Sequence, residues 1–236
     1  MKKTTCLAGQ LHITPKGHLI KLDFRDWFEI EYTPGCKNDY LEVRDGPHGY
    51  NSIIHEPFCG RGTFPPVITS TDRYLWIHFR SDENIEYRGF KAVFEFTKRP
   101  DTLKSPEIIP CVMNRTLMEE GELGKVDIQK DIMDFYIQHD MPIDCLWTIV
   151  VRPNWRIYLQ FAEFNLEKPN DCHSNFVQVF SGKTDMASIE KEFCGSIADT
   201  VMSKSNKMYV RFFSESKGSK TLFLANFTAY RDIGSD

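Results

Sequence analysis

The chain has 236 residues, a length that suits one large domain or two domains of ordinary size. Its formal net charge is −4, with lysine and arginine scattered along it, which argues against a nucleic-acid-binding surface. No apolar run approaches the roughly 20 residues of a membrane-spanning helix, and no continuous apolar segment follows the N-terminal lysines, so we expect neither a span nor a signal peptide here.

The first half of the chain consists largely of short alternating runs. In order these are "LIKLDFRDWFEIEYTPGC" at 19–36, "KNDYLEVRDG" at 37–46, "RYLWIHFRSD" at 73–82 and "GFKAVFEF" at 89–96. Alternation over short runs, punctuated by proline and glycine, is typical of half-buried antiparallel strands. Residues 98–110 follow with three prolines and mixed charge, and we interpret them as a stiff linker.

The second half repeats the first. The runs "RIYLQFAEFNLEKPNDC" at 156–172 and "HSNFVQVFSG" at 173–182 match the first two runs, and each half also contains the tripeptide "FCG". The later runs "KMYVRFFSE" and "FLANFTAY" correspond to the last two runs of the first half. Several such strands in each copy predict an all-β chain of two β-sandwiches.

The second copy begins with residues that have no clear counterpart in the first. There "LWTIVV" at 146–151 predicts a strand. The stretch "KVDIQKDIMDFY" at 125–136 is ambiguous, because its apolar spacing permits a short helix. The logic of the repeat favours opening strands and a loop instead, and that is our prediction for it.

The seven cysteines indicate an oxidising compartment. None forms a CxxC pair and no histidine has the spacing of a zinc ligand, so a metal–thiolate site is disfavoured. Widely spaced cysteines in a β-rich chain are typical of disulfides. Two glycosylation sequons agree with an extracellular setting, one at Asn114 and one at Asn226.

Glu31 and Asp39 lie close together in the sequence, on either side of Cys36. Paired carboxylates repel each other unless a proton, a base or a metal compensates. As an acid/base pair they would make a secreted hydrolase, but no further catalytic constellation supports a substrate cleft. The remaining alternatives are a metal site and ordinary solvated loop carboxylates.

Several motifs resemble those of CUB domains. They are "CKNDYLEVRDG", "FCG" and "FRSDENIEYRGF" in the first copy, and "DCLWTI", "IYLQF" and "FCG" in the second. The longer stretches "DYLEVRDGPHGYNSII", "STDRYLWIHFRSDE" and "DCLWTIVVRPNWRIYLQFAEFNLEKPNDC" are similar to the paired CUB domains of the neuropilin- and tolloid-like (Neto) family. The resemblance implies two jelly-roll-like antiparallel sandwiches, at residues 1–97 and 111–233, joined by the linker 98–110.

The resemblance also implies a disulfide framework and a truncation. The implied pairs are Cys36–Cys59, Cys111–Cys145 and Cys172–Cys194. The first copy starts where only the later cysteine of an opening pair would fall, so Cys6 is expected to be unpaired and the opening strands to be missing. A Neto chain would continue into a further small module, a membrane span and a cytoplasmic tail, so we expect truncation at both ends.

Many CUB domains bind calcium, and the resemblance carries this site onto the first copy. The implied ligands are the carboxylates of Glu31, Asp39 and Asp82, completed by the backbone carbonyl of Glu83 and the side chain of Asn84. Ca²⁺ prefers about 6–8 oxygen ligands, which carboxylates from separate loops can supply. The first copy lacks a bracing tyrosine of the family, which is expected to weaken the affinity.

The second copy is expected to bind no metal at the corresponding positions. There the three residues are Glu167, Asn175 and Glu215. One charge is lost and one side chain is longer, so Glu167 and Glu215 are predicted to be surface groups.

The predicted function is therefore a non-enzymatic extracellular protein-binding module. Resemblance to the Neto family implies an auxiliary subunit of kainate-type ionotropic glutamate receptors at the synapse, on the extracellular face of the plasma membrane or secreted. A second reading is a secreted CUB protein that docks or enhances a protease. The third is the hydrolase that uses Glu31 and Asp39.

Overall fold

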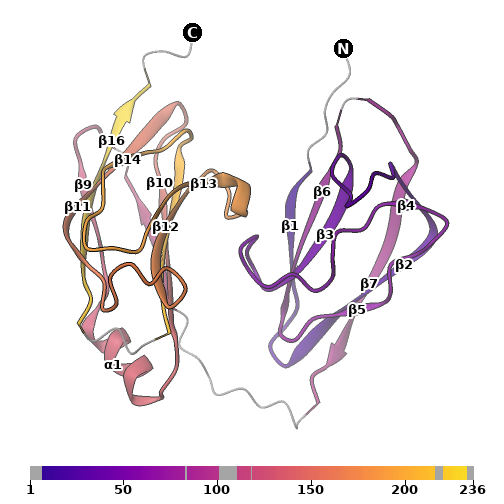
Figure 1. The fold of residues 1–236 in the computed structure, drawn as a ribbon, viewed down its shortest axis with the longest axis horizontal. Coiled ribbons are helices and arrows are strands. Elements are labelled where there is room, and N and C mark those ends of the chain that lie inside the picture. Colours follow the sequence, from indigo (N-terminus) through magenta and orange to yellow (C-terminus); the bar gives the residue numbers. More distant parts are fainter. Residues whose placement is uncertain (1–6, 83, 101–110, 118, 216–219, 233–236) are drawn as a thin grey trace. The chain divides into compact units, whose positions relative to one another are not determined.

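The computed structural model describes residues 7–82, 84–100, 111–117, 119–215 and 220–232, with the backbone alone described for residues 7–13. The chain divides into two compact units, Met1–Ser105 (unit 1) and Pro106–Asp236 (unit 2). Each unit packs one β-sheet face against another, which confirms the prediction of an all-β fold (Figure 1). None of the helices among the described residues is both long and apolar enough to cross a membrane.

Unit 1 is a small sandwich of two sheets. One sheet has the order β1-β6-β3, and in the other β2 pairs with β4, β5 and β7, all antiparallel. The strands are β1 (Leu7–Ile13), β2 (His18–Ile30), β3 (Tyr40–Asp45), β4 (Gly60–Arg61), β5 (Ile68–Thr69), β6 (Tyr74–Arg80) and β7 (Gly89–Lys98).

The alternation read from the sequence explains the core of unit 1. Along β2, Ile20, Leu22 and Phe24 are buried at 5% exposure or less, while the residues between them face outward. The pairing of β2 with β7 is irregular between Phe24 and Phe28, and both rings still face the core, 5.8 Å apart. The two sheets are therefore held together by the apolar side chains that alternate with polar ones along each strand.

Unit 2 is a larger sandwich. Its sheets have the orders β13-β12-β15-β10-β8 and β14-β11-β16-β9, antiparallel except for the parallel pair of β8 and β10. The elements are β8 (Cys111–Thr116), β9 (Leu123–Asp127), α1 (Lys130–Gln138), β10 (Ile143–Val150), β11 (Trp155–Asn165), β12 (Asn175–Ser181), the 3₁₀ turn η2 (Met186–Ser188), β13 (Ile189–Phe193), β14 (Val201–Met202), β15 (Lys207–Ser214) and β16 (Leu222–Arg231).

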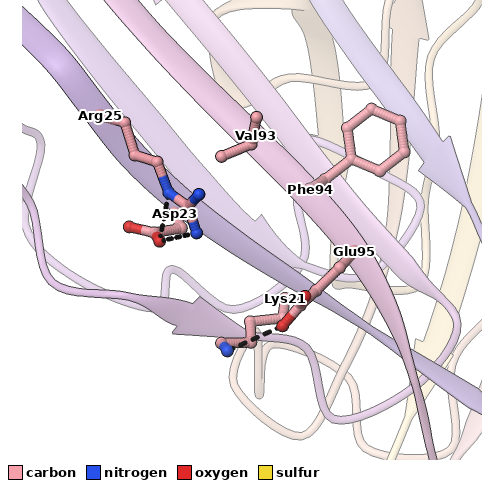
Figure 2. A pocket seen from close by; sticks show the side chains of 6 residues that line it. All are labelled: Lys21, Asp23, Arg25, Val93, Phe94 and Glu95. Atoms are coloured by element: carbon pink, nitrogen blue, oxygen red, sulfur yellow. Dashed lines mark hydrogen bonds and ion pairs between the residues drawn. The ribbon is translucent and has the colours of Figure 1, made fainter.

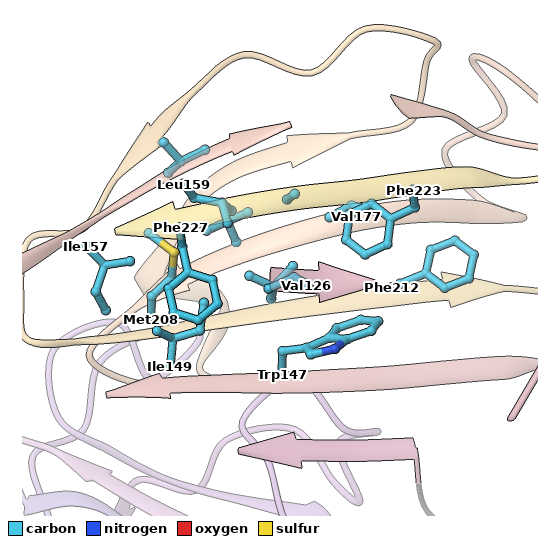
Figure 3. Close-up of a cluster of buried hydrophobic side chains, with 14 of the residues drawn as sticks. Val126, Trp147, Ile149, Ile157, Leu159, Val177, Met208, Phe212, Phe223 and Phe227 are labelled. Atoms are coloured by element: carbon cyan, nitrogen blue, oxygen red, sulfur yellow. The ribbon is translucent and has the colours of Figure 1, made fainter. Parts of the chain in front are cut away.

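The core of unit 2 is dominated by large side chains from both sheets (Figure 3). Trp147 on β10 is fully buried and meets Phe223 on β16 edge to face, with ring centroids 5.5 Å apart. The helix α1 packs Tyr136 against this core at 5% exposure. Our prediction of strands and a loop over 125–136 is wrong from Lys130 onward, because one apolar stripe of a helix satisfies the same spacing.

The repeat is visible in the hydrogen bonds as well as in the sequence. The amide of Ile20 on β2 donates to Ser70 Oγ at 2.8 Å, and the amide of Ile157 on β11 donates to Ser203 Oγ at 2.8 Å. This match makes β2 the counterpart of β11. Because β7 pairs with β2 and β16 pairs with β11, β7 is then the counterpart of β16. Among the described residues, unit 1 has no counterpart of β8 and β9.

We predict that Gly124 on β9 is essential for the packing of unit 2. A Cβ at this position would lie 2.0 Å from Cζ of Phe227, which is 1% exposed. Because the core cannot yield that much space, Gly124→Ala should lower the free energy of unfolding by about 1–3 kcal/mol. Leu123→Ala is the matched control, since Leu123 on the same strand is 75% exposed and should matter little. Chemical denaturation measures both, and equal stability of the two variants would contradict the packing argument.

Candidate metal centre

Two loops of unit 1 bring three carboxylates together. Glu31 follows β2, Asp39 precedes β3 and Asp82 follows β6, and their side-chain oxygens lie within 4.8 Å of one another. Glu31 is 7% exposed and Asp39 is 4% exposed, while Asp82 is half-buried. The structure thus gathers the three residues that the resemblance singled out; we call them the acidic cluster.

Asp39 anchors the loop after β6. The amide of Asp82 donates to Asp39 Oδ1 at 2.7 Å, and the hydroxyl of Ser81 donates to Oδ2 at 3.1 Å. Asn84 in turn donates to Asp82 from its backbone and its side-chain nitrogen, at 2.9 and 3.2 Å. Asn84 therefore orients a carboxylate of the acidic cluster, while Glu83 lies outside the described residues.

The loop between β2 and β3 is a compact turn. Thr33 accepts the amides of Lys37 and Asn38 on its hydroxyl, at 2.9 and 3.3 Å, and the amide of Cys36 on its carbonyl at 2.8 Å. Gly35 and Cys36 both have positive φ, 73° and 49°, which closes the turn. In this geometry the side-chain amide of Asn38 donates to Glu31 Oε2 at 3.4 Å.

In the structure a disulfide fastens the turn between β2 and β3 to the sandwich of unit 1, and another fastens the corresponding turn of unit 2. Cys36 is bonded to Cys59 in unit 1, and Cys172 to Cys194 at the same place in unit 2. A third bond joins Cys111 to Cys145, across the parallel pair of β8 and β10. Cys6, predicted to be unpaired, lies outside the described residues.

The acidic cluster carries like charges that the described residues do not neutralise. Its hydrogen-bond donors are a hydroxyl, backbone amides and asparagine side chains, and within the described part of the chain no ion pair to Lys, Arg or His reaches it. Buried carboxylates this close repel strongly unless a proton or a cation intervenes. An all-oxygen set of this kind fits a hard divalent cation such as Ca²⁺.

Glu42 on β3 shows what a neutralised buried carboxylate looks like in the same unit. It is 9% exposed, and Arg44 forms an ion pair with it while His78 Nδ1 lies 3.9 Å away. Burial acts to raise the pKa of Glu42, but the hydrogen bond to His78 and the charge of Arg44 outweigh it and hold the pKa below its usual value.

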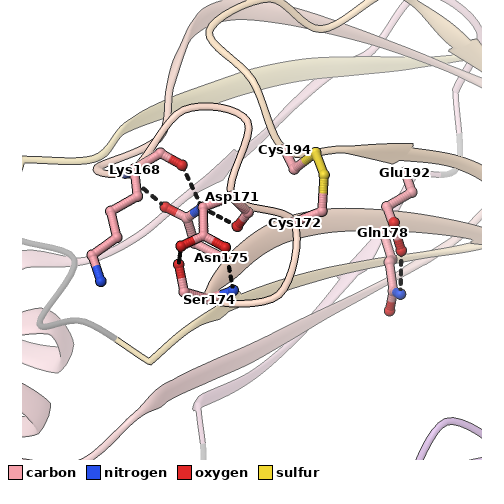
Figure 4. Close-up of a disulfide and its surroundings, with 8 residues drawn as sticks. All are labelled: Lys168, Asp171, Cys172, Ser174, Asn175, Gln178, Glu192 and Cys194. Atoms are coloured by element: carbon pink, nitrogen blue, oxygen red, sulfur yellow. Dashed lines mark hydrogen bonds between the residues drawn. A yellow bond between two sulfur atoms is a disulfide. The ribbon is translucent and has the colours of Figure 1, made fainter.

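In the corresponding loop of unit 2, a side-chain amide takes the place of the carboxylate and forms hydrogen bonds with the loop backbone (Figure 4). Asn175 is fully buried, and its Nδ2 donates to the carbonyls of Lys168 and Asp171 at 2.9 and 3.0 Å. Its Oδ1 accepts the amide of Lys168 at 3.0 Å. Glu215 is exposed and Glu167 is half-buried, and of the residues described only the acidic cluster of unit 1 groups three ligands.

Sequence reasoning missed residues that surround the acidic cluster. Ser81 and Asn38 donate to its carboxylates, and each stands next to a predicted ligand in the sequence, which is a signal that could have found them. Tyr32, beside Glu31, is 70% exposed and borders a surface hollow of about 400 Å³. Arg61 lines the same hollow and lies over the ring of Tyr87 at 5.3 Å.

Comparison with known proteins identifies the family. The family model of the CUB domain matches residues 3–94 and 133–227, one region in each unit. The chain therefore belongs to the CUB domain family, a class of extracellular protein-interaction modules.

Two curated relatives are consistent with this. Human neuropilin and tolloid-like protein 2 is 33% identical over 89% of this chain, which spans only 40% of that relative. Mouse tolloid-like protein 2 is 31% identical over 92% of this chain, which spans 24% of it. The solved CUB1-EGF-CUB2 domain of human MASP-1/3 aligns over 94% of this chain and 92% of its own, with 19% identity and a TM-score of 0.38.

We predict that Asn175 is a structural residue and that an acid there does not create a metal site. Asn175→Asp would turn a carboxylate oxygen toward the carbonyls of Lys168 and Asp171, losing two hydrogen bonds and adding repulsion. Each buried polar group left unsatisfied costs about 1–3 kcal/mol, so the unfolding midpoint of unit 2 should fall clearly. Glu215→Ala, at an exposed position, is the control. The prediction fails if Asn175→Asp is as stable as the control in thermal denaturation, with or without calcium.

Proposed function

We propose that this chain is a non-enzymatic, calcium-dependent protein-binding module. Calcium would be held in unit 1 by Glu31, Asp39 and Asp82, with Glu83 and Asn84 contributing from the loop after β6. The observation that supports this most is the acidic cluster: two of its carboxylates are almost fully buried, and it has no ion pair within the described residues. A bound dication would offset two of its three negative charges.

The proposed partner is an extracellular protein that presents a lysine or arginine. With calcium in place the cluster keeps a net negative charge, so it favours a charge-assisted hydrogen bond from a basic side chain. The exposed ring of Tyr32 and the pair of Arg61 and Tyr87 offer apolar and aromatic surface beside it. Bound calcium would fix the loop between β2 and β3, which carries Tyr32, and the loop after β6, which carries Tyr87.

By resemblance to the Neto family we propose an ionotropic glutamate receptor of the kainate type as the partner. The identity to human neuropilin and tolloid-like protein 2 supports this reading. Because the chain spans 40% of that relative, the auxiliary-subunit role and a place at the synaptic membrane belong to the proposal. Similarity to tolloid-like protein 2 supports the alternative, a secreted CUB protein that docks or enhances a protease.

A hydrolase built on Glu31 and Asp39 has less support. Asp39 is 4% exposed, and both its oxygens accept hydrogen bonds from the loop after β6. A general base must reach a substrate proton, and a carboxylate this buried and this engaged is poorly placed to do so.

The proposed organisation is a CUB domain at residues 1–97, a linker at 98–110 and a second CUB domain at 111–233. The three disulfides seen in the structure would form in the secretory pathway. Glycans are proposed at both sequons. Asn114 is exposed on strand β8, whereas Asn226 is half-buried on β16 between two neighbouring strands and has less room.

The calcium site predicts a specific set of calorimetric results. Asp39→Asn keeps an acceptor for the amide of Asp82 but removes a charge, and Asp82→Ala removes a ligand, so both should abolish the calcium-dependent heat. Glu56→Ala, an exposed carboxylate of the same unit, should leave it unchanged. Extracellular modules bind calcium at roughly 10⁻⁴–10⁻³ M, which sets the range of the titration. A silent wild-type chain, or an Asp39→Asn chain that still binds, would refute the site.

A further inference from the structure

The surface hollow of about 400 Å³ in unit 1 is built from the same two loops as the acidic cluster. Tyr32, on one wall, directly follows Glu31 in the chain. Tyr87, on another wall, belongs to the loop after β6 that also carries Asp82. Because Arg61 is its basic lining residue, we call this feature the Arg61 hollow.

Arg61 presents an unneutralised positive charge in this hollow. It is an exposed residue of β4, and its guanidinium carbon lies 5.3 Å from the centroid of the Tyr87 ring. Glu29 stands opposite Arg61 across β2 and β4, but among the described residues no ion pair joins Arg61 to this or any other carboxylate. The guanidinium is therefore open to a ligand on the side that the tyrosine ring does not cover.

A smaller hollow of unit 1, of about 120 Å³, has basic side chains whose charge is already compensated (Figure 2). It lies on the polar face of β2 and β7, and Phe94 is one of its lining residues. Lys21 pairs there with Glu95 at 2.8 Å, and Arg25 pairs with Asp23 at 2.7 Å. Each of these cations has a partner within its own sheet, which the arginine of the larger hollow lacks.

Unit 2 does not repeat the groups of the Arg61 hollow. Counted from the matched disulfides, Lys168 of unit 2 stands where unit 1 has Tyr32, and Ser196 stands where unit 1 has Arg61. The aromatic wall and the free guanidinium are thus confined to the copy that also has the acidic cluster. This coincidence suggests that the hollow and the cluster serve one binding event.

The chemistry of the Arg61 hollow selects a carboxylate on a peptide. The planar guanidinium of arginine matches a carboxylate with two parallel hydrogen bonds, and the two tyrosine rings can pack against the aliphatic part of an acidic side chain. The acidic cluster keeps a net negative charge even with calcium bound, so it repels a purely anionic ligand such as a sulfated glycan. A peptide that carries one basic and one acidic residue complements both charges at once.

We propose that the Arg61 hollow is a second subsite for the protein partner, in which Arg61 binds the carboxylate of an aspartate or glutamate. The partner would present this acid within a few residues of the lysine or arginine that reaches the acidic cluster. Tyr32, which is 70% exposed and lies between the cluster and the hollow in the chain, would contact both side chains. This inference rests on the proposed function and adds an acidic residue to what the partner must present.

The first test is a selection of random linear peptides displayed on phage, with the full chain immobilised and calcium at about 1 mM. The enriched peptides should combine a basic with an acidic residue. The same selection on the Arg61→Glu chain should yield peptides in which a base replaces the acid, because the charge of the subsite is reversed.

The second test measures affinity with the best selected peptide, labelled with fluorescein and followed by fluorescence anisotropy. Arg61→Ala in the chain, or replacement of the peptide's acid by its amide, should each weaken binding about tenfold. The two changes together should cost little more than either alone, because they remove the same contact. Arg25→Ala is the matched control, since Arg25 is an exposed arginine of the same sheet that is already paired, and it should leave the affinity unchanged.

The outcomes separate this subsite from the proposed function. Calcium-dependent binding of purely basic peptides, unaffected by Arg61→Ala, would overturn the subsite and leave the proposed function intact. Additive losses of about a hundredfold in the combined experiment would also overturn it, since the acid and Arg61 would then not meet. Arg61-dependent binding that persists in a chelator would support the subsite and contradict the calcium dependence. A selection that enriches no peptide with saturable binding would overturn both.

Discussion

The close approach of the carboxylates of Glu31, Asp39 and Asp82 is the constraint on which one end of unit 1 depends in our account. Two long-range features force these charges together: the disulfide Cys36–Cys59 and the hydrogen bonds from the loop after β6 to Asp39. Carboxylates placed this close in a poorly solvated site destabilise the loops that hold them. A divalent cation would compensate these charges and hold the two loops together. In our account, loop order, calcium binding and partner binding are therefore coupled.

The two copies of the domain differ at one position of this loop, where unit 1 has Asp39 and unit 2 has Asn175. Asp39 in unit 1 lies immediately before β3, Asn175 in unit 2 is the first residue of β12, and each follows a disulfide-bonded cysteine by three positions. The carboxylate accepts hydrogen bonds and leaves charge for a cation, whereas the amide also donates to two carbonyls and closes its own loop. The same scaffold thus yields one proposed metal centre and one self-sufficient turn.

The sequence predicted the features that depend on local period and on the repeat. Alternation predicted the strand β2, whose Ile20 and Leu22 lie in the core, and the resemblance to CUB domains singled out Glu31, Asp39 and Asp82, which the structure brings together. Helix α1 was missed because the logic of the repeat was preferred to an apolar spacing that itself permits a helix. The exposure of Phe94 could not be read locally either, since it depends on which strand lies beside β7.

Hydrogen–deuterium exchange of the full chain, with calcium near 1 mM and then with a chelator, tests the central claim most directly, since extracellular modules bind calcium at roughly 10⁻⁴–10⁻³ M. Our account predicts that amides in residues 31–39, and those of Ser81, Asp82 and Asn84, exchange more slowly when calcium is present. Residues 167–175 of unit 2 should exchange equally in both conditions. Unchanged exchange at the acidic cluster, or equal protection of both units, would contradict the proposal that calcium fixes these loops.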